Sequence, residues 1–191
     1  MPRLKPLTTK AELAEQHRHV ADKVVEVFGH IRGPFSMLLH SPKLAEQLLP
    51  LVTFARSTNV IEPRLRFAAI LAGVRESDSR YVWAAQVEQA RKNGIREELI
   101  DLVRARGDAS KLPQDEREIV AYVRELVRER RVSDATFEPL KAKYSEEWLV
   151  ELTAIVSFFG FVATICNAFE VEAPAGLDQL EPTNRASKPP R

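Results

Sequence analysis

The sequence predicts an all-α protein, a single-domain bundle of about seven or eight helices. Apolar residues recur at helical spacing between capping residues and glycine or proline breaks, and no β-type alternation continues for more than a few positions. The segments 63–75 and 146–170 are apolar nearly all round, which indicates cover on several sides, in a bundle core or at a subunit interface. We expect residues 1–179 to form the domain and residues 180–191 to form a disordered tail.

The N-terminal half is expected to hold four helices, over residues 10–29, 42–57, 63–75 and about 78–94. Thr9 and Glu12 fit a capping box at the start of the first helix. Pro50 should kink the second helix or split it into two, because proline lacks the N–H that the helix ladder uses. The link over 30–42 is apolar for a loop and should fold back onto the body of the protein.

The C-terminal half is expected to hold the remaining helices, over residues 95–105, 114–130, 134–144 and 146–170. The polar stretch 106–113 indicates a loop within one domain rather than a linker between two. From Glu172 onward the composition turns to proline, glycine and polar residues.

Composition narrows the possible functions. Charged residues make up 29% of the chain and nearly balance at a formal net charge of +1, which gives no case for a nucleic-acid or acidic-membrane partner. The single cysteine, Cys166, excludes an intrachain disulfide and a CxxC redox pair, and with four scattered histidines it argues against a metal site. Polar residues interrupt the apolar run over 148–171, which favours a core helix over a membrane span. Because the first ten residues also lack the apolar core of a signal peptide, we expect a cytoplasmic protein. We also expect no cofactor.

The stretch Pro63–Gly94, with the residue that follows it, holds the most distinctive pattern in the sequence. Its residues are Pro63, Arg64, Leu65, Arg66, Ile70, Leu71, Val74, Tyr81, Trp83, Ala84, Ala85, Val87, Ala90, Gly94 and Ile95. This pattern resembles the carboxymuconolactone decarboxylase family, which includes the alkyl hydroperoxidase D-like proteins. Weaker matches on both sides extend the resemblance over about 30–171. The resemblance implies an all-helical fold and assembly as homo-oligomers, usually trimers or hexamers. It also implies either decarboxylation of a lactone from aromatic-acid breakdown or thiol-based peroxide reduction through CxxCxxxH.

The sequence departs from both chemical patterns. The two thiol positions hold Ser79 and Val82, the histidine position holds Gln86, and the acidic position after the PRLR arginine holds Phe67. Thiol peroxidase activity is excluded, since neither serine nor valine can supply a thiolate or a resolving thiol. Decarboxylation is weakened, because glutamine can donate a hydrogen bond but is no practical proton donor. Ser79, Val82 and Gln86 are spaced i, i+3 and i+7 and should share one helix face that borders a pocket.

Three residues are candidates for catalysis. His40 could act as the general acid, since histidine titrates near neutral pH, although a surface position is the alternative. Gln86 could orient the substrate, with an interhelical hydrogen bond as the alternative. Arg66 could bind a substrate carboxylate, with a buried ion pair as the alternative.

Five residues are candidates for substrate binding: Trp83, Tyr81, Ser79, Phe67 and Asn167. The aromatic residues could form a pocket wall or serve as core anchors. Ser79 could simply begin a helix, and Asn167 could be a structural hydrogen-bonding residue.

Two functions remain open. The first is a decarboxylase-like lyase that acts on a small organic molecule, possibly carboxylated, without thiol redox chemistry. The second is a catalytically inactive oligomeric binding or scaffold protein of the same fold. A pocket beside Gln86 lined by ionisable groups would favour the enzyme, whereas a pocket filled by Phe67 and Trp83 would favour the scaffold.

Overall fold

The computed structural model describes residues 2–181, and this part of the chain contains helices and no strand. It holds nine α-helices: α1 (Arg18–Phe28), α2 (Pro34–Leu38), α3 (Pro42–Thr53), α4 (Pro63–Glu76), α5 (Arg80–Lys92), α6 (Glu97–Arg104), α7 (Gln114–Glu129), α8 (Asp134–Lys141) and α9 (Glu146–Ala168). The predicted fold class is confirmed, with one short helix more than expected.

Helix α4 is the centre of the fold. It packs against α5, α6, α7 and α9, and every residue from Leu65 to Val74 is buried. Small residues allow this close approach, since a side chain on Gly73 would meet Val156 of α9 and Val123 of α7. The all-round apolar composition of 63–75 therefore reflects burial on several sides within one chain.

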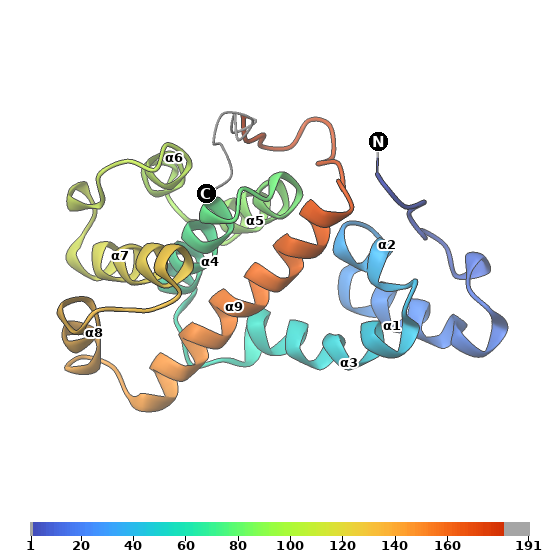
Figure 1. Ribbon diagram of the computed structural model, residues 1–191, viewed down its shortest axis with the longest axis horizontal. Helices are drawn as coiled ribbons and strands as arrows, with labels where there is room; N and C mark the ends of the chain where they lie inside the picture. The colour runs from blue at the N-terminus through green and yellow to red at the C-terminus, as the bar shows by residue number, and fades with distance from the viewer. Residues whose placement is uncertain (1, 182–191) are drawn as a thin grey trace, which may run out of the picture.

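Helix α9 runs diagonally across the molecule between two groups of helices (Figure 1). Helices α1 to α3 lie on one side and α4 to α8 on the other, with α2, α4, α5 and α8 all in contact with α9. Among the described residues, α9 is the one helix long and apolar enough to cross a membrane by length and composition. Half of that apolar window is buried in the fold, and the core helix of a soluble protein meets the same criteria.

Three local predictions need correction. The first predicted helix begins late, because residues 10–17 form two 3₁₀ turns before α1. The link 30–42 folds back as expected, but it contains α2, whose Phe35, Met37 and Leu38 are buried.

The split at Pro50, one of the two outcomes predicted for it, does not occur, because α3 continues through Pro50 as far as Thr53. Proline removes a single hydrogen bond from the ladder, and the burial of Leu49 and Val52 on either side holds the helix together. A π-helical turn, Phe54–Thr58, follows α3.

The C-terminal segment leaves α9 and passes over α5 (Figure 1). Leu180, which falls within the predicted disordered tail, is buried. Residues 182–191 of that tail lie outside the described residues.

Candidate functional site

A cavity of about 840 Å³ lies where α4, α5 and α9 meet the end of α1, the start of α2, the end of α3 and the π turn. Its apolar wall comes from all of these elements and includes Phe28, Phe35, Val52, Phe67, Ile70, Val82, Phe158, Phe159 and Val162. Its polar lining includes His30, Arg32, Arg56, Arg66, Tyr81, Gln86, Glu88, Gln89 and Asn93. An apolar cavity with a few converging polar groups is typical of a small-molecule site.

One face of α5 lines this cavity. Val82, Ala85, Gln86 and Gln89 are spaced i, i+3, i+4 and i+7, so they project to the same side. Trp83 lies one position beyond this face and is fully buried on the other side of the helix.

Arg66 is the most unusual group in the cavity wall. Its side chain is buried at 8% exposure, and within residues 2–181 no carboxylate pairs with it. Its hydrogen bond is a long one, from Nη1 to Oδ1 of Asn59 at 3.4 Å, and its guanidinium lies 5.8 Å from the ring centre of Phe67. Burial lowers the pKa of Arg66, as expected for a charge held away from water without a counter-ion.

Tyr81 is the second ionisable group that sequence analysis selected and that lines the cavity. Its ring lies against Gly33, where a Cβ atom would come within 2.1 Å of the ring and where the backbone has a φ of 57°. Only glycine suits that position, so the contact fixes the ring at the start of α2. Burial raises the pKa of Tyr81 to about 12, which keeps the phenol neutral at physiological pH.

The structure places Phe67, Arg66, Tyr81 and Gln86 together in the cavity wall. It places the other four predicted residues, His40, Asn167, Ser79 and Trp83, outside the lining. His40 is exposed, with its ring Nε2 2.9 Å from the backbone oxygen of Lys5. Asn167 is exposed and donates from Nδ2 to the backbone oxygen of Ser77 at 2.8 Å. Ser79 is fully buried at the start of α5, and its hydroxyl has no hydrogen-bond partner among residues 2–181.

Trp83, the predicted aromatic wall, points away from the cavity. Its indole Nε1 donates to Oδ1 of Asp178 at 2.8 Å, so it holds the C-terminal segment. Sequence analysis missed that segment, which contributes Pro174, Ala175 and Leu177 to the lining. No periodic signal marks these residues, because they lie outside regular structure.

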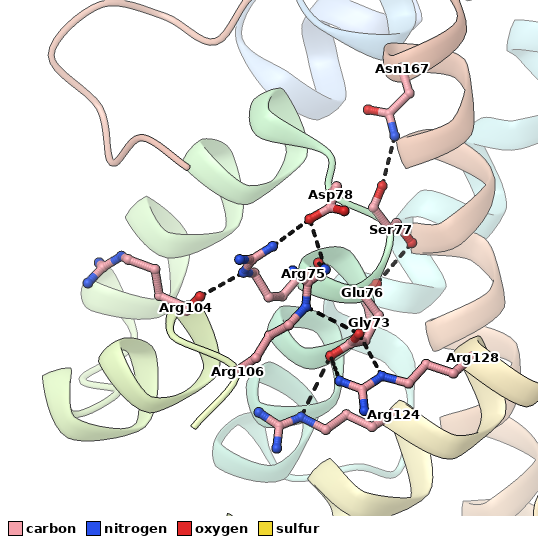
Figure 2. A network of polar contacts seen from close by, with 10 residues as sticks. All are labelled: Gly73, Arg75, Glu76, Ser77, Asp78, Arg104, Arg106, Arg124, Arg128 and Asn167. Carbon is pink, nitrogen blue, oxygen red and sulfur yellow. Dashed lines mark hydrogen bonds and ion pairs between the residues drawn. The ribbon is translucent and has the colours of Figure 1, made fainter. Parts of the chain in front are cut away.

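A second polar cluster, at the turn between α4 and α5, is closed by its own ion pairs (Figure 2). Glu76 pairs with Arg106, Arg124 and Arg128, and Asp78 pairs with Arg75 and Arg106. This network fixes the turn that precedes the pocket-lining helix.

The chemistry open to the site is limited by its residues. Among the described residues, no group of three or more histidines, cysteines, aspartates or glutamates could hold a metal ion. Cys166 is buried, and burial raises the pKa of its thiol to about 12. A thiol in this state is not a nucleophile at neutral pH.

The fold is that of the alkyl hydroperoxidase D-like proteins. A solved protein of unknown function from Agrobacterium tumefaciens, suggested to be the antioxidant defence protein AhpD, superposes with a TM-score of 0.66. The match has 20% sequence identity and covers 72% of this chain and 95% of that one.

The debrominase Bmp8 has the same fold. A cysteine-to-alanine variant of it, in complex with 2,3,4-tribromopyrrole, gives a TM-score of 0.69 at 18% identity, over 92% of this chain and 95% of that one. Its apo form gives 0.67 at 19% identity, over 88% and 92%. Family models give no match to this chain, and neither do the curated proteins. The predicted fold family is therefore confirmed at the level of the fold.

Proposed function

We propose, from the alkyl hydroperoxidase D-like fold and this cavity, that the chain is a carboxymuconolactone decarboxylase-like protein that binds a small carboxylated organic molecule without thiol redox chemistry. The observation that carries the proposal is Arg66, a buried guanidinium without a carboxylate partner in the described chain, at the wall of an apolar cavity. A bound carboxylate would supply the missing counter-charge, and guanidinium and carboxylate form two parallel hydrogen bonds. The apolar lining would hold the rest of the molecule.

A flat aromatic molecule is the second candidate ligand for this chain. The fold neighbour Bmp8 supports it, since a variant of Bmp8 binds 2,3,4-tribromopyrrole. Phe28, Phe35 and Phe67 would offer aromatic surface to such a ring.

The chemical step would be a decarboxylation. The bond to the departing carboxylate breaks, its electron pair passes to a conjugated carbonyl of the substrate, and the resulting carbanion takes up a proton. Arg66 would hold a second carboxylate that stays, because pairing the departing one would stabilise the ground state. Gln86 would donate a hydrogen bond to the carbonyl.

The proton would come from an ionisable group of the cavity. His30 and Tyr81 line it, and Nδ1 of His30 lies 2.6 Å from the backbone oxygen of Phe28. His40 lies outside the cavity lining, so unchanged turnover in His40→Ala would remove it from the mechanism.

Binding tests the proposal most directly. Calorimetry with aromatic and lactone carboxylates, their uncharged amides and a brominated pyrrole should favour the carboxylates. Arg66→Met should weaken carboxylate binding about tenfold or more, since a hydrogen-bonded charge pair is lost. Arg56→Met is the matched control, because Arg56 lines the same cavity but is exposed. Equal affinities for acids and amides would contradict the proposal, as would unchanged binding in Arg66→Met.

A homo-oligomer is part of the proposal, and α9 supports it. Six of its exposed positions are spaced four and three apart in alternation: Val150, Ala154, Ser157, Phe161, Thr164 and Ala168. This is the heptad spacing of helix pairing, and no charged residue lies between Glu151 and Glu170. The face suits a second copy of the chain, in a trimer or hexamer, and also fits the alternative of an inactive oligomeric binding protein.

Light scattering after size exclusion tests the oligomer. Phe161→Glu should shift the mass toward that of a monomer, because a charge would be buried at the interface. Ala121→Glu adds the same charge at an exposed site of α7 and should leave the mass unchanged. A monomeric wild type would refute this part of the proposal.

A further inference from the structure

The C-terminal segment 171–181 is part of the cavity wall. It leaves α9, runs past α5 (Figure 1) and places Pro174, Ala175 and Leu177 in the lining. The segment has a fixed shape of its own, because Nε2 of Gln179 donates to the backbone oxygens of Pro174 at 3.1 Å and Leu177 at 3.0 Å. It therefore forms one wall of the cavity that belongs to no helix.

One side chain attaches this wall to the helices. The carboxylate of Asp178, whose side chain is 10% exposed, accepts hydrogen bonds from Nε1 of Trp83 at 2.8 Å and from Nη2 of Arg104 at 2.6 Å. Arg91 adds a third contact at 3.0 Å from Nη2. Burial alone would raise the pKa of Asp178, but the hydrogen bonds from Trp83 and Arg104 outweigh it and lower that pKa below its usual range. Three donors from α5 and α6 thus converge on one carboxylate.

The rest of the segment is attached to the helices by few contacts. Within the described chain, the backbone of residues 173–181 makes no hydrogen bond to the helices, and the N–H of Leu177 bonds to Pro174 of the same segment. Most of its side chains are exposed or half-buried, and Leu180 is the buried exception. A segment with few buried contacts and no ladder of hydrogen bonds opens more readily than the core.

We propose that residues 171–181 form a strap that closes one side of the cavity and selects the molecules that enter, with Asp178 as the positioning residue that anchors it. Ligand selection rests on the proposed function, whereas the attachment of the strap does not. Trp83, which the sequence marks as a pocket residue, serves the pocket indirectly by holding its removable wall. Leu177 then limits the size of the ligand from the strap side.

Trp83 reports directly on the attachment. The chain has two tryptophans, so Trp148→Phe leaves Trp83 as the single fluorophore, and the phenyl ring keeps the stacking position on Tyr144. In this background Asp178→Asn should raise acrylamide quenching of Trp83 severalfold, because the fully buried indole becomes accessible when the strap detaches. Glu181→Gln removes an exposed carboxylate from the same segment and is the matched control. Unchanged quenching in Asp178→Asn would overturn the proposal.

The second measurement uses 8-anilinonaphthalene-1-sulfonate, an anionic apolar probe, in stopped-flow binding. Asp178→Asn should raise both the association rate and the dissociation rate of the probe about tenfold, because the strap loses its charged hydrogen bonds and opens more readily. Since both rates rise together, the Kd of the probe should change less than either rate. If Asp178 only stabilised the fold, its substitution would alter the Kd of the probe without raising both rates together. Leu177→Ala should improve binding of this probe relative to benzoate.

The outcomes separate the two proposals. Increased quenching in Asp178→Asn without any ligand binding to the wild type would keep the attachment by Asp178 and reject the proposed function and ligand selection. Ligand binding with unchanged quenching and unchanged rates would keep the proposed function and reject the strap.

Discussion

Arg66 and Arg75 lie on the same helix, α4, yet they face opposite electrostatic surroundings. Arg75 donates from Nε to the backbone oxygen of Arg104 at 2.7 Å and pairs through Nη1 with Asp78. Arg66 has a single long hydrogen bond to the neutral side chain of Asn59. Burial lowers the pKa of both arginines, but only Arg75 has a neighbouring carboxylate that opposes this effect.

The surroundings of Arg75 form a closed network (Figure 2). Glu76, at 5% side-chain exposure, accepts two hydrogen bonds of 2.8 Å from Arg128 and is also paired with Arg106 and Arg124. Its carboxylate is already used inside the protein, as is that of Asp78. The comparison teaches that the number of arginines does not mark a binding site. An arginine marks one when the protein supplies no counter-charge and a cavity lies beside it.

The largest expected effect comes from breaking the closed network. Glu76→Gln should lower the free energy of unfolding by about 3 kcal/mol, because it removes the carboxylate that pairs with Arg124, whose side chain is 13% exposed, and with Arg106 and Arg128. The value lies at the low end of the range for buried pairs, since Arg128 is half exposed. Urea denaturation monitored by circular dichroism measures it.

Glu138→Gln is the control for this variant. Glu138 is 61% exposed and lies 3.8 Å from Lys141, so its loss should change stability little. If both variants had equally small effects, the ion pairs around Glu76 would not stabilise the fold as the comparison requires.

Arg66→Met should have a smaller effect of the opposite sign. It removes a buried charge that lacks a counter-ion and keeps most of the side-chain volume, so the free energy of unfolding should rise by about 1 kcal/mol. Asn59 loses one donor, but its Oδ1 still accepts from the backbone N–H of Ile61 at 3.2 Å. Stability and binding would then move in opposite directions, as expected when a binding residue is costly to the fold.

The same urea titration checks this variant. A loss of 2 kcal/mol or more, of the size that follows the loss of a buried pair, would indicate that Arg66 has a stabilising partner and would end the contrast with Arg75.

The long helices could be predicted from the sequence because their signals are local. Helix α7 was expected over 114–130 and spans Gln114–Glu129, and α9 was expected over 146–170 and spans Glu146–Ala168. Apolar spacing and capping residues are enough to fix such elements. Helix α2 could not be predicted in this way, because its five residues are too few to show a helical period.

The cavity could be predicted in part. Helical geometry places Val82 and Gln86 on one face, and both line the cavity. The same geometry fails for Ser79, which precedes the first residue of α5, and for Trp83, which lies one position beyond the face. The contact between Trp83 and Asp178 spans 95 residues of sequence, and no local pattern encodes it.

Ser79 gives the smallest predicted effect and extends the comparison to a neutral group. Like Arg66 it is a buried polar residue without an adequate partner, and its hydroxyl makes no capping bond to α5. Ser79→Ala should therefore leave stability unchanged or raise it by up to about 1 kcal/mol, since the unpaired hydroxyl is removed and nothing else is lost.

Ser77→Ala is the matched control. The hydroxyl of Ser77 donates to the backbone oxygen of Gly73 at 2.9 Å, so that variant should lose stability. Thermal unfolding of the two variants compares them directly. A larger loss in Ser79→Ala than in Ser77→Ala would mean that the hydroxyl of Ser79 has a partner, such as a bound molecule, and would end its likeness to Arg66.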